Sequence, residues 1–527
     1  MIMILLFIQC GLIEVKAVAS EKTISNRIAT CYDYLSDNDV KKGNKILEIK
    51  GVVDLKGQTF HVPESCILSF NGGIIRNGVV VGAQTKIDAR QKSPFFESVR
   101  IEGSWNVPMI SSTFFKDQSK ENILLQLFAL TDSVLYNKVV IERGTYYVSR
   151  QNERDGIINI KSNTDVDIKG RIILLPNNNT HCYLLNVENA ENVTINGGVL
   201  VGDRQNHMCA KGEWGHGLFI WGNSKNVIVN NIKISECWGD GVAIGRQEPC
   251  KNISLNNLKI ENCRRNGISI IAVEGCKVYN CGISNISGTA PEYAVDIEPN
   301  KGGHVKDVIL EKLNIRSKSG ILLPIINQSE LHFIRDITIE NCTIKTRLRC
   351  ISVDGAENVK ILGNVMENSN EESTPLVIDH DSRRVIISKN IIKKIIKEAN
   401  NKVAVVFVNP DSVNMLGNTI IGQNCSAAYF VNGNHAIKEN HIRCNWGFTR
   451  ITNSLIENNE YYGDGFLVNR ASNCIFKRNR IKSSTGLFVS DRKDRFCNNI
   501  LNNNTIETKE LQKGISNQWA GNKVTTL

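Results

Sequence analysis

Short segments of alternating apolar and polar residues recur along the middle of the chain. Those with the form Gly-apolar-x-apolar, or a close variant, begin at these positions: Gly217, Gly241, Gly267, Ala294, Gly320 and Cys350. Consecutive starts are roughly 24–30 residues apart. Between them lie further alternating segments with Asn-rich ends, such as "KNVIVNNIKISEC" from Lys225 to Cys237. Alternation with a period of two indicates β-strands, and a repeat of this length indicates one coil of a parallel β-solenoid per period.

The pattern extends toward both ends of the chain. Alternating stretches occur at Ile67–Ile87, Ile101–Trp105 and Glu142–Val148, and "ENILLQLFAL" at 121–130 has the apolar spacing of a short helix. We therefore expect an all-β chain with an N-terminal cap region. The expected organisation is as follows: a signal peptide at 1–19, a β-rich cap region with a short helix at 20–150, the solenoid at 151–510, and a C-terminal tail or cap at 511–527.

The Asn-Asn-x-Ile corner motif covers roughly Lys225 to Glu507. In this motif the chain resembles the right-handed parallel β-helix proteins of the pectin-lyase-like superfamily, in particular exported bacterial ones. The resemblance implies a single-stranded right-handed parallel β-helix. It does not decide function, because the superfamily includes lyases, hydrolases, epimerases, tailspikes and adhesins. Of the polygalacturonase motifs only Gly215-His216-Gly217 is present; the Asp-Asp and Arg-Ile-Lys motifs are missing.

Stacking the coils about 4.8 Å apart aligns equivalent positions in columns along the axis. Two columns are wholly aliphatic and are expected to point inward: Leu218, Val242, Ile268, Val295, Ile321, Ile351, and Ile220, Ile244, Ile270, Ile297, Leu323, Val353. The positions between them then point outward. Asp296 and Glu298 lie in these outward columns, and Phe219 and Trp221 lie there three coils earlier. The sequence predicts an exposed pair of carboxylates beside small residues that leave room for a ligand.

Two carboxyl groups on alternate positions of one strand have Cα atoms about 6.5–7 Å apart. Such a pair can act as acid and nucleophile, or acid and base, in glycosidic cleavage. Repulsion between them raises one pKa, which leaves one group protonated near neutral pH. We predict Asp296, Glu298 and Asp240 as catalytic residues; the alternative is a solvated polar face.

The corners that lead into these strands carry further polar and aromatic residues. "GEWGHG" and "ECWGDG" have the same phase in consecutive coils, so Trp214 should stack on Trp238 and His216 on Asp240. The polar insert "VGDRQNH" from Val201 is expected to wall the cleft. The predicted substrate-binding residues are these: His216, Arg265, Trp214, Trp221, Trp238, Arg264, Asn266 and Asp203.

Charge and composition narrow the setting. The net charge is +10, from 63 basic and 53 acidic residues, which favours an acidic partner such as an anionic polysaccharide. No apolar run is long enough to span a bilayer, and no Cys or His spacing indicates zinc or another bound metal. An apolar run at Ile2–Ile8, followed by Ala17-Val18-Ala19, predicts export to the periplasm, cell surface or medium, although the basic n-region is missing.

These features together predict a glycoside hydrolase acting on a polysaccharide or oligosaccharide, with no cofactor and no nucleic-acid partner. One alternative is a lyase on a uronic-acid polymer, in which Arg265 or His216 would be the base and Ca²⁺ would neutralise carboxylates. The other is a surface or tail protein that binds glycan without cleaving it.

Overall fold

A computed structural model describes most of the chain. The described residues are these: 32–33, 45–89, 93–116, 123–150, 156–300, 302–324, 333–379, 382–465, 467–484, 496–509, 511 and 516–527. The predicted signal peptide, 1–19, lies outside them. Within the described ranges, no helix has both the length and the apolar character needed to cross a bilayer.

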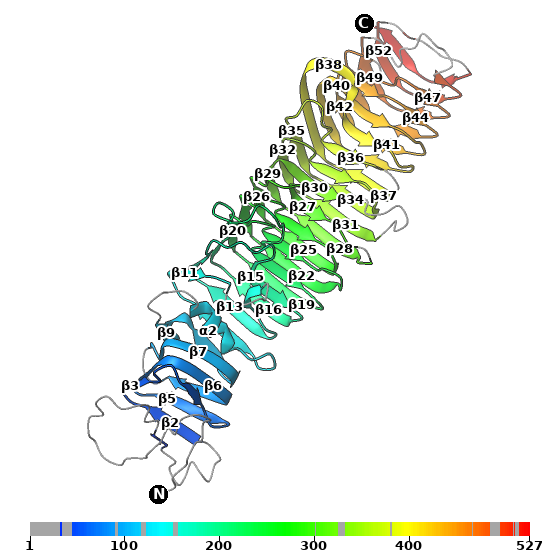
Figure 1. The fold of residues 1–527 in the computed structure, drawn as a ribbon. Coiled ribbons are helices and arrows are strands. Elements are labelled where there is room, and N and C mark those ends of the chain that lie inside the picture. Colours follow the sequence, from blue (N-terminus) through cyan, green and yellow to red (C-terminus); the bar gives the residue numbers. More distant parts are fainter. Residues whose placement is uncertain are drawn as a thin grey trace. The chain divides into compact units, whose positions relative to one another are not determined.

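The chain is a right-handed parallel β-helix with an N-terminal cap region, as predicted (Figure 1). It divides into two compact units. Unit 1 comprises Met1–Gly212 and Lys225–Lys233, and unit 2 comprises Glu213–Ser224 and Ile234–Leu527. All but one of the residues predicted for the site belong to unit 2; Asp203 belongs to unit 1.

Unit 1 begins with one sheet and a helix. The strands of this sheet are β1 (Tyr32–Asp33), β2 (Lys45–Ile49), β3 (Val52–Asp54), β4 (Thr59–His61), β5 (Cys66–Phe70), β6 (Ile74–Ala89), β7 (Phe96–Trp105) and β9 (Phe115–Lys116). Helix α2 (Ile123–Ala129) buries Leu124, Leu127 and Phe128. This helix confirms the short helix predicted at 121–130, and it packs against β7 and β12.

The remaining strands of unit 1 form its first coils. They are β8 (Met109–Ser111), β10 (Asn137–Ile141), β11 (Thr145–Val148), β12 (Gly156–Asn159), β13 (Thr164–Ile168), β14 (Arg171–Leu174), β15 (Tyr183–Glu188), β16 (Glu191–Asn196), β17 (Val199–Val201) and β19 (Lys225–Asn230). The pairings β8–β10–β13–β16–β19 are all parallel. Strand β20 (Lys233–Ser235) has residues of both units.

Unit 2 stacks its strands in three parallel rows. The first row is β22 (Cys250–Asn256), β25 (Val273–Tyr279), β28 (Val305–Glu311), β31 (Ile334–Glu340), β34 (Glu357–Leu362), β37 (Arg383–Ser388), β39 (Asn414–Leu416), β41 (Ala436–Lys438), β45 (Leu455–Glu457), β48 (Ile475–Lys477), β51 (Ile500–Asn502) and β53 (Gln518–Ala520). The second row is β23 (Lys259–Glu261), β26 (Gly282–Ser284), β29 (Asn314–Ser317), β32 (Thr343–Thr346), β35 (Val365–Asn368), β38 (Ile391–Val408), β40 (Thr419–Phe430), β42 (His441–Arg443), β46 (Glu460–Gly463), β49 (Arg480–Ser483), β52 (Thr505–Thr508) and β54 (Lys523–Thr526).

The third row carries the strands predicted to hold the site. It is β18 (Leu218–Trp221), β21 (Val242–Ile244), β24 (Ile268–Ile270), β27 (Tyr293–Ile297), β30 (Ser319–Leu323), β33 (Ile351–Val353) and β36 (Leu376–Ile378), after which it joins the long β38 and β40 and then β43 (Trp446–Phe448). The short strands β44 (Ile451–Thr452), β47 (Ala471–Ser472) and β50 (Phe496–Cys497) pair with one another. Strands β53 and β54 lie in the segment 511–527 that was expected to be a C-terminal tail or cap. They pair with β51 and β52 of the preceding coil.

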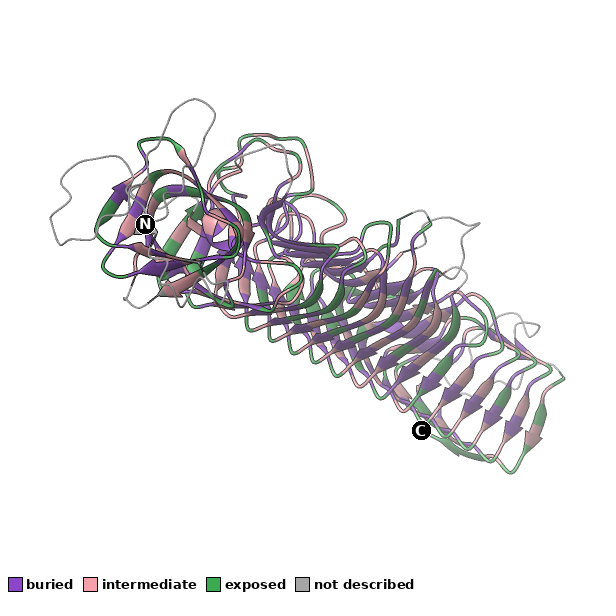
Figure 2. Ribbon diagram, turned by 90° about the horizontal axis from the view of Figure 1, so that it is seen from below, coloured by how far each residue is buried: buried purple, intermediate pink, exposed green. Residues whose placement is uncertain are grey.

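The aliphatic columns of the third row point inward, as expected from the alternation. Val242, Ile268 and Val295 align in register, and each is fully buried. Figure 2 shows that buried strand residues and more exposed corner residues recur in each successive coil of unit 2. The inward columns therefore form the core that fixes the height and orientation of each strand.

A second buried column consists of asparagines. It contains Asn364, Asn390, Asn418, Asn440, Asn459, Asn479, Asn504 and Asn522. From Asn390 onward, each Oδ1 accepts hydrogen bonds from the backbone N–H and the Nδ2 of the asparagine one coil earlier, and the Asn364 Oδ1 accepts from the backbone N–H of Cys342; the Asn390-to-Asn418 bonds are both 3.0 Å. Each Nδ2 also donates to a strand carbonyl. This column, called the asparagine ladder below, satisfies polar groups that would otherwise be buried without partners.

Candidate functional site

The corners before β21, β24 and β27 bring charged residues of unit 2 together. Asp240 ends one corner, Arg265 and Asn266 end the next, and Asp296 and Glu298 follow on and after β27. These five residues are called the carboxylate site. In the register of the sheet, Asp296 lies beside Ser269, and Ser269 beside Ala243, as the predicted outward columns required.

One expectation about the site is wrong. Asp296 points away from the interior of the solenoid, yet it is only 1% exposed, and so is Asp240. The reason is that side chains from the preceding corners fold over the outward face: the Nδ2 of Asn266 donates to the Oδ2 of Asp296 at 2.9 Å. Ala243 and Ser269 are also covered, so they do not provide the open space that was expected. Alternation predicts on which side of a strand a side chain lies. It does not predict which corner side chains cover that side.

Asp240 is surrounded by hydrogen-bond donors. Its Oδ1 accepts from the backbone N–H of Asn266 at 2.9 Å, and its Oδ2 accepts from the Ser269 hydroxyl at 2.9 Å. The Arg265 guanidinium lies 3.3 Å from Oδ2. Asp240 is therefore a buried carboxyl group whose oxygens already have hydrogen-bond and ion-pair partners.

Asp296 has the opposite environment. Its Oδ1 is buried and has no hydrogen-bond partner among the described residues. Burial, followed by the negative charge of Glu298, raises the pKa of Asp296 well above its ordinary value, and Arg265 offsets only part of this. The raised pKa favours the protonated form of this carboxyl group over the ionised one.

Arg265 connects the acidic residues. Its nitrogens lie 3.3 Å from Asp240, 3.7 Å from Glu298 and 3.4 Å from Glu213. Burial acts to lower the pKa of Arg265, but the carboxylates of Asp240, Asp296 and Glu298 outweigh it and raise the pKa. Glu298 is the open member of the group, because its side chain is 47% exposed. The carboxylate site thus has two buried carboxyl groups, Asp240 and Asp296, and one accessible carboxyl group, Glu298, around a single guanidinium.

His216 lies against Asp240, as the common phase of their corners predicted. Its Nδ1 accepts a hydrogen bond from the backbone N–H of Asp240 at 3.1 Å. A neutral His216 consequently carries its proton on Nε2. The close contact of these corners depends on Gly239: an added Cβ there would lie 2.4 Å from the Glu213 carbonyl oxygen and 3.0 Å from His216 Nδ1.

The aromatic residues differ in how much surface they offer. Trp214 is 44% exposed. Trp221 stacks on buried Phe219 at 5.5 Å between ring centroids, with Arg246 5.6 Å from its ring. Arg264 lies 3.8 Å over the Trp238 ring and covers that face. Trp214 and Trp221 are therefore better placed than Trp238 to stack on a ligand, and Arg264 shields a tryptophan.

Asp203 belongs to unit 1 and stays a prediction for the site. It is buried, and its Oδ2 lies 2.8 Å from both His207 Nδ1 and Asn177 Nδ2. Asn266 was predicted to bind substrate, but its side chain already hydrogen-bonds to Asp296, to Ser269 and to the backbone N–H of Tyr293. It therefore positions the Asp296 carboxyl group. Glu213 and Ser269 were missed as polar partners. Their only sequence signal is their position beside residues that were singled out.

No cluster of three or more His, Cys, Asp or Glu side chains suited to hold an ion occurs in the part of the chain that the structure describes. The cysteines described there are all thiols, and most are buried, including Cys237 and Cys263 at the same phase of two coils. Their role as small core residues agrees with the interpretation of the sequence.

Comparisons with known proteins were made against this geometry. No family model matches the chain. Uncharacterized protein YclG of Bacillus subtilis (strain 168) is 31% identical over 124 residues, which is 21% of this chain and 21% of that protein. The SPbeta prophage-derived uncharacterized protein YorA of the same organism is 35% identical over 106 residues, 18% of each chain. The chain thus matches about a fifth of the length of these curated relatives.

Several solved structures share the fold. The tailspike protein of E. coli bacteriophage HK620, solved in complex with a pentasaccharide, has 16% identity and a TM-score of 0.47, covering 69% of this chain and 72% of that one. The mannuronan C-5 epimerase AlgE4 A-module of Azotobacter vinelandii has 12% identity and a TM-score of 0.38, covering 74% and 89%. The surface adhesin PfbA of Streptococcus pneumoniae has 14% identity and a TM-score of 0.40, covering 72% and 83%. These likenesses concern the parallel β-helix fold alone; the pectin-lyase-like superfamily stays a prediction.

Proposed function

We propose that the protein hydrolyses glycosidic bonds of a polysaccharide, with Asp296 as the general acid. The observation that carries the proposal is the buried Asp296 carboxyl: its pKa is raised, and its Oδ1 has no partner among the described residues. A general acid for glycosidic cleavage must be protonated and must present that proton to the leaving oxygen, so the corner side chains that cover Asp296 would have to move when substrate binds. An environment that leaves one carboxyl oxygen unpaired is costly unless a ligand uses it.

Glu298 is the partner carboxylate in this mechanism. It is accessible, and its only described ion pair is the 3.7 Å contact with Arg265. It is therefore free to act as the base that activates water or as the nucleophile. Its charge also keeps the proton on Asp296, as in other pairs of carboxyls whose surroundings separate their pKa values.

Asp240 has a positioning role in this proposal. Its oxygens are occupied by Ser269, Asn266 and Arg265. It holds Arg265 between the acidic residues and aligns the corner that carries Asn266, which in turn holds Asp296. Trp214 and Trp221 would stack on sugar rings beside the carboxyls.

The lyase alternative has less support. Arg265 is enclosed by carboxylates that raise its pKa, which makes it a poor base. The Nδ1 of His216 is already an acceptor for a backbone N–H. A calcium ion remains an expectation only for that alternative. Export, predicted from the first twenty residues, would place the protein where it meets such a polymer.

Purified protein should release reducing ends from at least one member of a panel of plant, algal and host glycans. Asp296→Asn and Glu298→Gln should each lower kcat by about 10²–10⁴-fold, the usual contribution of a positioned acid or base. Glu274→Gln is the matched control, because Glu274 is a surface carboxylate of β25 paired with Lys251 and His304. Unsaturated products with ultraviolet absorbance would indicate a lyase, whereas affinity without any product would indicate a binding protein. Full activity in both carboxyl variants would remove the assignment.

A further inference from the structure

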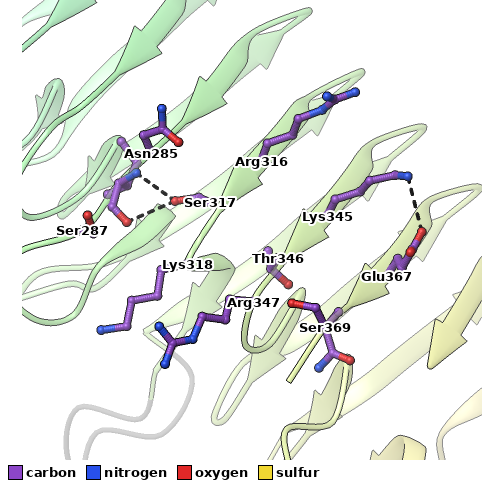
Figure 3. A pocket seen from close by; sticks show the side chains of 12 residues that line it. Asn285, Ser287, Arg316, Ser317, Lys318, Lys345, Thr346, Arg347, Glu367 and Ser369 are labelled. Atoms are coloured by element: carbon purple, nitrogen blue, oxygen red, sulfur yellow. Dashed lines mark hydrogen bonds and ion pairs between the residues drawn. The ribbon is translucent and has the colours of Figure 1, made fainter. Parts of the chain in front are cut away.

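A groove with many basic residues lies along the next coils of unit 2 (Figure 3). Its volume is about 700 Å³, and it is lined by the ends of β26, β29, β32 and β35 and the corners that follow them. Its charged lining residues are Arg316, Lys318, Lys345, Arg347 and Glu367. They are called the basic groove.

The cations of the basic groove exceed the carboxylates that could neutralise them. Lys345 lies 3.4 Å from Glu367, and Lys318 is paired with Glu292. Arg316 and Arg347, both exposed, form no salt bridge among the residues that the structure describes, although Glu292 lies close enough to Arg347 for their charges to interact. Arg316 also lies directly beside Lys345 in the parallel register of β29 and β32. Like charges placed side by side on a sheet weaken it, so this arrangement costs stability that a bound anion would recover.

The basic groove and the carboxylate site share one loop. Asn285, Ile286 and Ser287, which follow β26, line the groove. The same loop ends at β27, which carries Asp296, and its Glu292 binds Lys318 of the following coil. Because coils are about 4.8 Å apart, Lys318 and Arg347 lie about one and two coil spacings along the axis from the level of Asp296. Lys318 is in register with Glu292, which lies four residues, or about 13 Å, before Asp296 along the strand direction, so a sugar chain that reaches both places must run obliquely across the coils.

We propose that the basic groove binds carboxylate or sulfate groups of an anionic polysaccharide while a neighbouring sugar occupies the carboxylate site. This deepens the proposed function, because it gives the substrate class as a polyanionic glycan. Arg316 and Arg347 are the principal contacts, since planar guanidinium groups bind carboxylate or sulfate with paired hydrogen bonds. Ser369 at the groove offers a hydroxyl to a sugar oxygen, whereas the Ser317 hydroxyl already donates to the Ile286 carbonyl and accepts from the Ile286 backbone N–H.

A nucleic acid fits these residues less well. Single-stranded nucleic acid is bound through aromatic platforms as well as cations. The described lining of the groove contains no aromatic side chain. A glycan with spaced anionic groups needs only the cations and hydroxyls that are present.

The test measures affinity in the Asp296→Asn background, in which no turnover is expected. Titration calorimetry would use oligogalacturonate, chondroitin sulfate oligosaccharides and, as neutral probes, xylo-oligosaccharides. An anionic probe should bind more tightly than the neutral ones. The added pair Arg316→Gln and Arg347→Gln should weaken that binding by about tenfold per arginine. The control pair Arg335→Gln and Lys360→Gln, on exposed positions of the first row, should leave it unchanged.

Three outcomes would overturn the inference: no binding of any anionic probe, equal loss in the control pair, or tighter binding of a single-stranded DNA oligonucleotide that the same arginines support. These results are separable from the proposed activity. A wild type without hydrolytic product but with arginine-dependent binding would refute hydrolysis and keep the groove. Hydrolysis of a neutral glycan, unaffected by the arginine pair, would do the reverse.

Discussion

Replacing Asp296 with asparagine should make the protein more stable at neutral pH while removing its activity. The substitution preserves shape and the existing hydrogen bond, because an amide oxygen can accept from Asn266 Nδ2 as the carboxyl oxygen does at 2.9 Å. The new NH₂ group takes the place of the Oδ1 that has no partner among the described residues. What is lost is the ionisable group itself.

The magnitude follows from proton linkage. The pKa of Asp296 is raised in the folded protein by burial and by Glu298, relative to an ordinary value of 3.8. Between these two pKa values the folded state binds the extra proton, so the free energy of unfolding falls as the pH rises. The slope from one such group is at most about 1.4 kcal/mol per pH unit. Asp296→Asn lacks this slope, so its stability should exceed that of the wild type increasingly as pH rises through the window.

Denaturant unfolding measured from pH 3 to pH 8 would test this. Tryptophan fluorescence is the suitable signal, because Trp221 and Trp238 lie close to the site and report the coils concerned, even if a solenoid unfolds in parts. Glu274→Gln provides a control of opposite sign. Hydrogen bonds from Lys251, and then from His304, lower the pKa of Glu274 to about 2, so its loss should reduce stability at neutral pH.

The reasoning would be refuted if Asp296→Asn were less stable than the wild type at neutral pH, or if the two stability curves ran parallel between pH 4 and pH 7. Either result would mean that Asp296 is ionised in the folded protein and serves as a structural anion paired with Arg265. The general acid would then have to be another residue.

Other consequences can be tested separately. Glu298→Gln should move the alkaline limb of the residual activity to lower pH, because the charge of Glu298 helps to raise the pKa of Asp296; an unmoved limb in a pH–rate profile would contradict this. Asn418→Ala should cost roughly 2–4 kcal/mol in chemical unfolding, because it leaves the Asn390 backbone N–H without its acceptor; Asn418→Asp should not restore the loss, because it keeps that acceptor but places an oxygen where Nδ2 donates to the Ile387 carbonyl and to Asn440 Oδ1. Ile297→Ala empties a fully buried position and should cost roughly 2–5 kcal/mol, confined largely to adjacent coils; a loss below 1 kcal/mol would show that the site can collapse.

The sequence predicts the fold and much of the register because both depend on local periodicity. Alternation assigns Val295 and Ile297 to the interior and Asp296 to the opposite side, and the strand pairings confirm this assignment. The repeat length identifies the coils, and the matching corners place His216 against Asp240. These properties follow from spacing alone.

The burial of Asp296 could not be predicted in the same way. It depends on Asn266 reaching from one corner to the strand of the next coil, and on the path of a non-periodic corner. The ion pair of Glu213 with Arg265 likewise joins corners two coils apart. Contacts between corner residues depend on the three-dimensional path of each corner, which the repeat pattern of the sequence does not describe.

The asparagine ladder has a consequence for how such a protein can change length. Every coil from Asn364 onward accepts from the coil before it and donates to the coil after it through the same amide group. In the coils that hold the carboxylate site, the same position is occupied by buried apolar residues such as Leu258 and Cys281. A whole coil could therefore be duplicated or deleted within the ladder and its two new neighbours would still fit, whereas a single-residue insertion in a strand would misalign every amide of that coil. The C-terminal part of this protein can thus vary in units of one coil without altering the chemistry of the site.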